Sequence, residues 1–240
     1  MSVTGIVAAL TAEARTLAPV QAAPGSAAAP PITALTRDRL LAVSGMGAPA
    51  AARAAEALVA AGAHGLLSFG LAGALDPQLR AGSWVLALTA LGGTAALPAD
   101  GPWREHLAEQ AAALPDPPRV VSGPVLGVTQ PLGSVAAKTQ ARMRSGASAV
   151  DMESRAIAEV AARRGVKFAI ARVVIDTADD AVPPSLLSAT DSFGAVRPLR
   201  LLSALAGSPA DLAALLRLAQ RYRVALHSLR RLAQLDLRLP

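Results

Sequence analysis

The sequence predicts an α/β protein, a three-layer αβα sandwich in which a mixed central sheet is covered by helices on both faces. Short runs rich in Val, Ile and Leu alternate with alanine-rich segments of helical spacing. Some runs, such as FAIARVVI at 168–175, are apolar on both faces, which is typical of strands buried between helical layers. With 240 residues, 52% of them apolar, the chain is long enough for one domain with its own core.

The expected elements follow one another in βα order. Strands are predicted at residues 3–9, 39–43, 65–69, 84–88, 120–128 and 167–175. Helices are predicted at residues 48–61, 103–114, 135–144 and 152–164. A short strand is expected to end in AVDMES at 149–154, where the last of these helices begins. We assign these elements to one core, residues 1–182.

Residues 183–240 are predicted to form an arginine-rich helical extension packed on the core within the same domain. Pro183 and Pro184 open a segment of short helical pieces, and 210–235 is predicted to be one long helix. Steps of three and four separate its apolar positions, with arginines on other faces. This pattern favours either packing on the sheet or contact with a membrane surface. The apolar positions are Leu212, Leu215, Ala219, Tyr222, Leu226, Leu229 and Ala233.

Charge and cysteine content exclude several classes of protein. The net charge of +6 lies wholly in residues 196–240, where eight arginines face two aspartates, so no nucleic-acid partner is expected. The absence of cysteine excludes a disulfide scaffold, a thiolate zinc site and a cysteine nucleophile. Proline or glycine interrupts the uncharged runs 16–36 and 81–99, and no secretory signal is evident, so a cytoplasmic location is expected.

Neither a metal site nor a nicotinamide site is predicted. His64, His106 and His227 are scattered, with no metal-ligand spacing. SGMGAPA at 44–50 matches the glycine pattern of a dinucleotide fingerprint, but no acidic residue follows about 20 positions later. Glycines there can still bring backbone N–H groups close to a ligand. We therefore expect no resident cofactor.

Carboxylates give the strongest indication of chemistry. Glu13 follows the first predicted strand, Asp151 and Glu153 lie at a strand–helix junction, and Asp176 ends the strand FAIARVVID. Ligands of open α/β sheets bind beyond the carboxyl ends of the strands, where these side chains are expected to meet. Capping and turn chemistry is the alternative for each residue alone. Several carboxylates around one pocket favour acid–base cleavage of a glycosidic bond through a cationic transition state.

The order of several motifs resembles the nucleoside phosphorylase superfamily, and within it the methylthioadenosine/S-adenosylhomocysteine nucleosidases. The motifs are GIVAALTAEA at 5–14, VSGMG at 43–47, FGLAGAL at 69–75 followed by AGSWV, AVDMESRAIA at 149–158 and RVVIDTAD at 172–179. The resemblance spans most of residues 3–180, and its specific part is the pair DMES and IDTAD. It implies adenine release from a 5′-substituted adenosine by a homodimer.

The resemblance also implies residue roles. Glu13 activates the attacking water, Met152 and Glu153 bind the ribose, and Asp176 protonates N7 of the departing purine. Gly70 and Ala72 are also placed against the substrate. Leu126 and Val128, in the segment after Ser122, are candidates for packing on adenine. Two departures from the family pattern are Leu71 and Ile175, where these enzymes commonly carry serines.

The segment SGPVLGVTQPLGSVAAK at 122–138 and the arginine-rich tail resemble the hopanoid-associated phosphorylase branch. This resemblance implies adenosylhopane, a lipophilic 5′-substituted adenosine, as substrate. Alternatives are a methylthioadenosine/S-adenosylhomocysteine nucleosidase and a non-catalytic nucleoside-binding homologue. Hydrolysis is favoured, because the Glu13 carboxylate repels phosphate and no arginine lies nearer the glycine block along the chain than Arg80. Phosphate is the alternative co-substrate.

Overall fold

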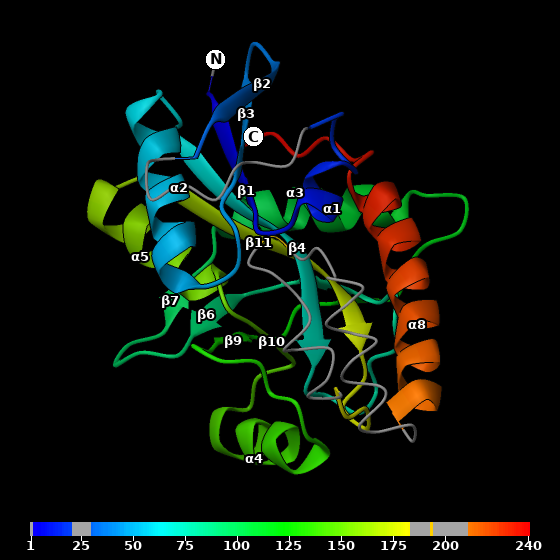
Figure 1. The fold of residues 1–240 in the computed structure, drawn as a ribbon. Helices are drawn as coiled ribbons and strands as arrows, with labels where there is room; N and C mark the ends of the chain where they lie inside the picture. Colours follow the sequence, from blue (N-terminus) through cyan, green and yellow to red (C-terminus); the bar gives the residue numbers. More distant parts are fainter. Residues whose placement is uncertain (1, 21–29, 183–192, 194–210) are drawn as a thin grey trace.

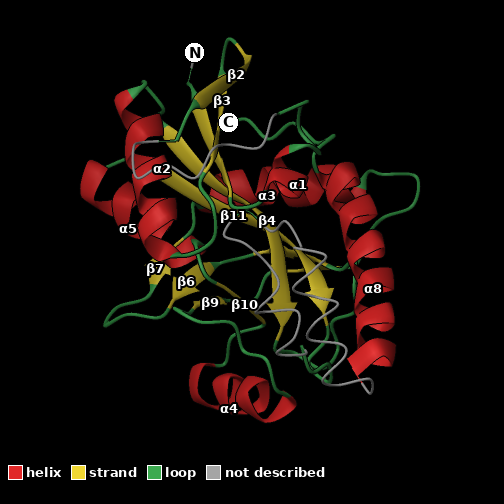
Figure 2. Ribbon diagram, viewed as in Figure 1, coloured by secondary structure: helices red, strands yellow, loops and turns green. Residues whose placement is uncertain are grey.

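The structure is a computed structural model of the chain, and it describes residues 2–20, 30–182, 193 and 211–240. It confirms the predicted three-layer α/β sandwich with a mixed central sheet (Figures 1 and 2). The strands are β1 (Thr4–Ala8), β2 (Ile32–Thr36), β3 (Arg39–Val43), β4 (Gly65–Ala74), β5 (Trp84–Leu86), β6 (Thr89–Leu91), β7 (Leu97–Pro98), β8 (Val120–Val121), β9 (Val125–Gly127), β10 (Ala149–Asp151) and β11 (Lys167–Asp176). The helices are α1 (Thr11–Ala14), α2 (Ala48–Ala60), α3 (Gly101–Ala112), α4 (Val135–Ser145), α5 (Ser154–Arg164) and α8 (Asp211–Leu232).

The sheet is organised around the long strands β4 and β11. Along one path the strand order is β2-β3-β1-β4-β10-β9-β6-β7, and β11 pairs with both β4 and β5. One edge of β4 pairs first with β1, in parallel at residues 65–69, and then with β10, antiparallel at residues 73 and 74. Residues 70–72 lie between these two partners. On this edge the backbone groups of residues 70–72 are consequently available to bind other groups, while their other edge pairs with β11.

Alternate residues of the strands face two different helical layers. One face carries Leu66 of β4 and Ile170 of β11, which pack with α2 and α5. The opposite face carries Leu67 and Ala169, which pack with α1, α3 and α8. Figure 2 shows these helices on either side of the sheet. The period of two in a strand therefore builds both apolar layers from the same segments.

Most predicted strands and helices are present within a few residues, with three differences in the strands. The strand predicted at 65–69 continues through the glycine block to Ala74. The strand predicted at 120–128 is two short strands, β8 and β9, because Gly123 and Pro124 interrupt it. Three short strands were not predicted: β6 and β7 have only three and two residues, and β2 is an edge strand whose side chains are mostly exposed, so it has no buried apolar run.

The long C-terminal helix is confirmed as α8, and its second half packs on the sheet. Ala225, Leu229 and Leu232 are fully buried there. The predicted apolar seam is right from Tyr222 onward but wrong at Ala219, which is exposed because this end of the helix is further from the core. The side chains of Leu212 and Leu215 and the helical pieces predicted from residue 183 to 210 lie outside the described residues.

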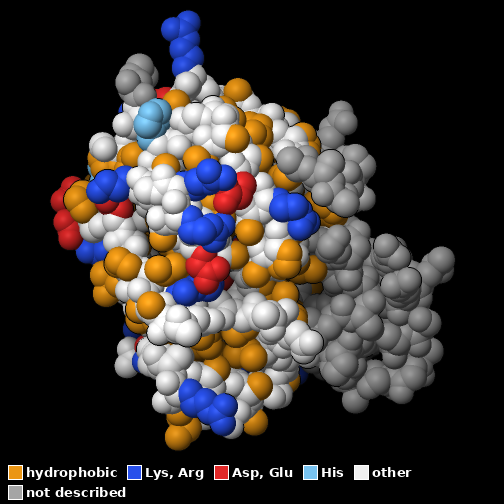
Figure 3. All heavy atoms as spheres, turned by 90° about the vertical axis from the view of Figure 1, so that its left-hand side faces the viewer, with side chains coloured by type: hydrophobic (Ala, Val, Ile, Leu, Met, Phe, Trp, Pro, Cys, Tyr) orange, Lys and Arg blue, Asp and Glu red, His pale blue; other side chains and the backbone are white. Residues whose placement is uncertain are grey.

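The described surface mixes both signs of charge. Figure 3, which views the α2 and α5 side, shows basic and acidic side chains next to one another. Arg163 and Arg164 of α5, for example, both pair with Glu56 of α2, at 3.0 and 2.7 Å. Among the described helices, none is long and apolar enough to cross a membrane.

Candidate active site

A pocket of about 200 Å³ opens where β1, β10 and β11 end and where β4 changes partner. Six predicted site residues line it: Glu13, Ala72, Val128, Met152, Glu153 and Asp176. The remaining predicted residue, Gly70, lies behind Glu13. The structure thus brings together side chains that are up to 163 positions apart in the sequence.

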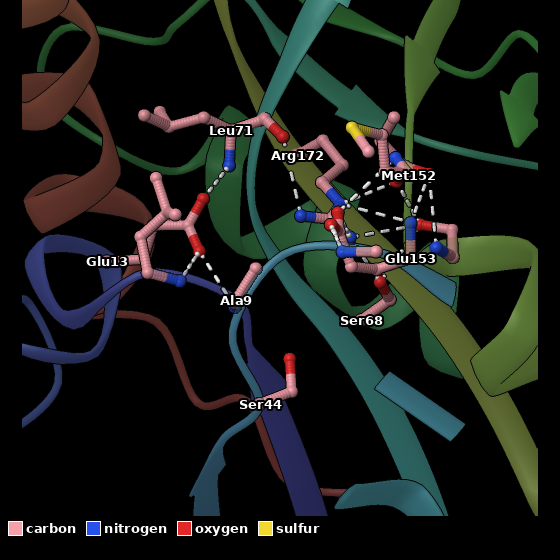
Figure 4. A network of polar contacts seen from close by, with 12 residues as sticks. Ala9, Glu13, Ser44, Ser68, Leu71, Met152, Glu153 and Arg172 are labelled. Carbon is pink, nitrogen blue, oxygen red and sulfur yellow. Dashed lines mark hydrogen bonds and ion pairs between the residues drawn. The ribbon is translucent and has the colours of Figure 1, made fainter. Parts of the chain in front are cut away.

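Glu13 is held by backbone N–H groups. After β1 the chain turns into α1, and the Glu13 Oε2 atom accepts hydrogen bonds from the backbone nitrogens of Ala9 and Leu10, both at 2.9 Å. The Oε1 atom accepts one from the nitrogen of Leu71, at 2.8 Å. Figure 4 shows the carboxylate between Ala9 and Leu71. Burial raises the pKa of Glu13, against the lowering effects of the Arg172 charge and these three donors.

Gly70 allows this close approach. A Cβ atom at position 70 would lie 2.5–2.7 Å from the Glu13 carboxylate atoms, and the residue has φ = 150°. Gly70 therefore lies directly behind the Glu13 carboxylate, and its contact with substrate stays a prediction. Leu71, where the family commonly has serine, contributes its backbone N–H to Glu13, while its side chain is buried in the apolar layer.

Glu153 and Met152 form the floor of the pocket at the start of α5. Glu153 Oε1 accepts a hydrogen bond from the backbone nitrogen of Gly47, at 2.8 Å, which joins the glycine turn before α2 to this site. Burial raises the pKa of Glu153 to about 7, aided by the negative charges of Asp151 and Glu13 and opposed by Arg172. Asp151 itself accepts hydrogen bonds from the backbone nitrogens of Glu153 and Ser154, which hold the turn that leads into α5.

Arg172 is the residue near these carboxylates that sequence reasoning missed. It pairs with Gly70 in the β11–β4 register, and its side chain is 1% exposed. Its Nε atom lies 2.9 Å from Asp151 Oδ2, and its Nη2 atom lies 2.7 Å from Ser68 Oγ and 3.7 Å from Glu153 Oε2. Figure 4 shows Arg172 together with Ser68 and Glu153.

Arg80 is the arginine nearest to the glycine block along the chain, but it is not the nearest in three dimensions. Strand pairing places Arg172, 102 positions further along the chain, opposite Gly70. A charged residue inside the otherwise apolar run FAIARVVI was the available signal. Such a residue is almost never buried without a partner.

Asp176 ends β11 and lines the pocket. Its Oδ2 atom accepts a hydrogen bond from Lys138 Nζ of α4, a side chain that is 1% exposed. Burial raises the pKa of Asp176, while the charges of Lys138 and Arg221 oppose that change. Ile175, the second departure from the family pattern, lines the pocket beside it. Lys138 was not predicted as a site residue.

The arrangement supplies two buried carboxyl groups with raised pKa values, Glu13 and Asp176, at separate parts of one pocket. One can accept a proton and the other can donate one. Glu153 adds an acceptor between them for hydroxyl groups of a ligand. Among the described residues, no three His, Asp or Glu side chains are grouped as metal ligands.

Residues 32–200 match the protein family described as the phosphorylase superfamily. The chain belongs to this superfamily. The matched region contains every predicted site residue except Glu13, which precedes it. Comparison with curated proteins finds no match to the sequence.

Solved structures share the fold over nearly the whole chain of this superfamily member. A mutant of the Helicobacter pylori nucleosidase MTAN with 5′-methylthioadenosine in its active site is 14% identical, with 97% of this chain and 98% of that chain covered and a TM-score of 0.65. The Campylobacter jejuni 5′-methylthioadenosine/S-adenosyl homocysteine nucleosidase is 18% identical, with coverage of 93% and 100% and a TM-score of 0.67. The Neisseria meningitidis enzyme in complex with methylthio-immucillin-A is 18% identical, with coverage of 95% and 99% and a TM-score of 0.62.

Proposed function

We propose that this protein hydrolyses the N-glycosidic bond of a 5′-substituted adenosine and releases adenine. The observation that carries the proposal is the placement of Glu13 and Asp176 around one pocket, with Met152 and Glu153 between the segments that hold them. Superfamily membership and the nucleosidase neighbours support the same chemistry.

In the proposed reaction, Glu13 takes a proton from water as the water oxygen bonds to C1′ of the ribose. The bond between C1′ and N9 breaks, and its electron pair leaves with the purine. Asp176 donates a proton to N7, which makes adenine a neutral leaving group. Glu153 accepts hydrogen bonds from ribose hydroxyls, and its negative charge stabilises the cationic sugar.

Water rather than phosphate is supported by the surroundings of Glu13. Three backbone N–H groups that could bind an anion already donate to its carboxylate. The nearby guanidinium of Arg172 is buried and occupied by Asp151, Ser68 and the carbonyl oxygen of Leu71. The Glu13 carboxylate therefore repels a phosphate ion at this position, where none of the described groups is free to bind the anion.

We further propose a lipophilic 5′ substituent, with adenosylhopane as the substrate. Apolar side chains provide much of the pocket lining, including Leu10, Met46, Leu132, Ile175 and Val182. Residues 183–192 and 194–210 of the tail that motivates this assignment lie outside the described residues. Methylthioadenosine is the second candidate, because the neighbouring structures are nucleosidases solved with it or with an analogue such as methylthio-immucillin-A.

Membrane contact through α8 is part of the same proposal. Leu216 and Val224 are 64% and 47% exposed on this helix, and Arg217 and Arg223 are exposed beside them. Such a surface suits an interface with anionic lipid. The homodimer stays a prediction from the resemblance, and light scattering of the purified protein tests it.

The experiment is chromatographic detection of adenine from adenosylhopane and from methylthioadenosine, each with and without phosphate. We expect phosphate-independent release, with adenosylhopane preferred. Glu13→Gln should abolish it, and phosphate-dependent activity retained in that variant would contradict hydrolysis. Preference for methylthioadenosine would overturn the lipophilic assignment alone. Tight adenosine binding without release from either substrate would identify a non-catalytic homologue.

A further inference from the structure

Lys138 is unusual in its place and in its partners. It is the one buried residue of α4, and its side chain is 1% exposed. The Nζ atom donates to Asp176 Oδ2, to the carbonyl oxygen of Thr177 at 2.7 Å and to that of Asp180 at 2.9 Å. All three ammonium protons therefore have acceptors, which is what a buried charge requires.

Lysine is rare in this chain, which indicates that position 138 requires lysine and not arginine. The sequence has 23 Lys and Arg residues, of which only Lys138 and Lys167 are lysines. A planar guanidinium presents its donors as a fork, whereas an ammonium directs three donors from one atom. The three acceptors of Lys138 converge on one atom, so they match the ammonium.

The turn that follows Asp176 is also held from α8. Asp180 Oδ2 accepts hydrogen bonds from the nitrogen and the hydroxyl of Thr177, both at 2.8 Å. Arg221 of α8 forms an ion pair with the Asp180 carboxylate, and its Nη1 atom lies 3.3 Å from Thr177 Oγ1. Lys138 of α4 and Arg221 of α8 thus both bind the turn 177–180. Lys138 binds its carbonyl oxygens, and Arg221 binds the Asp180 carboxylate.

We propose that Lys138 and Arg221 are positioning residues for Asp176. Lys138 fixes Oδ2, so that Oδ1 is the oxygen that carries the proton toward the leaving group. Arg221 holds the turn that supplies two acceptors of Lys138. The inference rests on the proposed role of Asp176, and it extends the site to the C-terminal helix.

The electrostatics of this proposal have a definite sign. Burial raises the pKa of Asp176, and the positive charges of Lys138 and Arg221 act against that rise. The only other titratable side chain in direct contact with this group of residues, among those described, is Asp180, which pairs with Arg221. Removal of Lys138 therefore leaves Asp176 protonated to higher pH, because a nearby cation no longer favours its ionised form.

The first test compares Lys138→Met with Lys167→Met, which removes the other lysine at a side chain that is 61% exposed. We expect Lys138→Met to lower kcat about 100-fold with little change in KM, since small displacements of a reacting group have effects of this size. The alkaline limb of its pH–rate profile should move to higher pH. Lys138→Arg should keep the charge but lose most of the rate. Lys167→Met should change neither quantity.

A second readout does not depend on turnover. The carboxyl carbon of Asp176, followed by ¹³C NMR and assigned by its loss in Asp176→Asn, should titrate at higher pH in Lys138→Met than in the wild type. Arg221→Gln should shift it less, and Arg217→Gln, at an exposed position of the same helix, should not shift it. An unmoved titration in folded Lys138→Met overturns the proposal.

The double variant Lys138→Met/Asp176→Asn separates this inference from the proposed function. If Lys138 acts through Asp176, the double variant should be no slower than Asp176→Asn alone. A loss equal to the product of the two single effects contradicts the positioning role. Unchanged adenine release in Asp176→Asn instead contradicts the proposed function, and the NMR titration then still decides whether Lys138 governs this carboxyl group.

Discussion

Two carboxyl groups of the same chemical type receive different surroundings at this site. Glu13 is bound by three backbone N–H groups, whereas Asp176 is bound by an ammonium on one oxygen. Both are buried and have raised pKa values. Because only one side of Asp176 is occupied by Lys138, that carboxyl group is suited to give a proton into the pocket.

Asp176→Asn should lower kcat by about 10²- to 10⁴-fold, the usual contribution of a general acid. The amide keeps the size of the side chain but cannot donate a carboxyl proton. Adenine release under saturating substrate measures the effect, and circular dichroism checks that the fold is intact. Turnover within a few-fold of the wild type rules out the role of Asp176 as proton donor.

Gly70→Ala should impair activity more than stability. Its Cβ atom would lie 2.5–2.7 Å from the Glu13 carboxylate, so Glu13 must leave its three N–H donors. Gly62→Ala is the matched control, because Gly62 has φ = 96° but nothing within 4 Å of the added atom. Both substitutions should cost about 1 kcal/mol or more through backbone strain.

Only Gly70→Ala should also lower kcat, by about 100-fold as expected for a displaced catalytic group. Urea unfolding and adenine release, measured on both variants, separate the two effects. Equal rates in the two alanine variants would show that contact with Gly70 does not position Glu13.

The sequence predicted the acidic residues of the site but not the cations that hold them. Glu13, Glu153 and Asp176 were accessible because each follows a recognisable strand and belongs to a family motif. Lys138 and Arg172 lie 38 and 102 positions from their partners Asp176 and Gly70, and only strand register and helix placement bring them close. The periodicity of the sequence predicts neither the register of the strands nor the placement of the helices.

At the scale of secondary-structure elements, the apolar pattern predicted the long strands and helices more reliably than it predicted where each of them ends. β11 and α8 were predicted within a few residues because each repeats its apolar pattern over ten residues or more. The extension of β4 through FGLAGAL was missed, since glycines in a strand weaken the expected pattern. That extension belongs to the candidate site, because it places the Leu71 N–H group beside Glu13.

The attachment of α8 to the core depends on a polar contact as well as on leucines. Trp84 Nε1 of β5 donates to Ser228 Oγ at 2.7 Å, and Ser228 Oγ donates to the carbonyl oxygen of Gly82, also at 2.7 Å. Ser228→Ala should lower the free energy of unfolding by about 1–3 kcal/mol, because it leaves the buried indole N–H without an acceptor.

Leu216→Ala is the control on the same helix. Its side chain is 64% exposed, so the change should stay within about 0.5 kcal/mol. Denaturant midpoints of both variants check the difference. A Ser228→Ala variant as stable as Leu216→Ala would mean that water replaces the hydroxyl and that this contact does not fasten α8.

At the scale of the whole molecule, the site gives the fold a pH dependence. Burial, with the charges of Asp151 and Glu13, raises the pKa of Glu153 to about 7 from an ordinary value of 4.5. Between these two values the folded protein binds more protons at Glu153 than the unfolded chain does. Its contribution to stability is therefore present at low pH and is lost as the pH rises toward about 7.

Glu153→Gln should remove the contribution of Glu153 to the pH dependence of the unfolding free energy. The difference in unfolding free energy between variant and wild type should move in favour of the variant by on the order of 3 kcal/mol from pH 4.5 to pH 8, since each pKa unit corresponds to about 1.4 kcal/mol. Urea unfolding at intervals across this range measures it. Above about pH 7, where Glu153 is ionised, adenine release should fall in the same variant, which loses the negative charge beside the ribose.

Glu56→Gln provides a control of opposite sign. Hydrogen bonds from Arg164 and Arg163 lower the pKa of Glu56, so its contribution to stability is present above its ordinary value of 4.5 and is lost only below it. This variant should therefore track the wild-type slope between pH 5 and 8. If the unfolding free energy of Glu153→Gln also follows the wild-type pH dependence, the fold does not raise the pKa of Glu153. Ionisation of Glu153 then does not destabilise the folded protein at neutral pH.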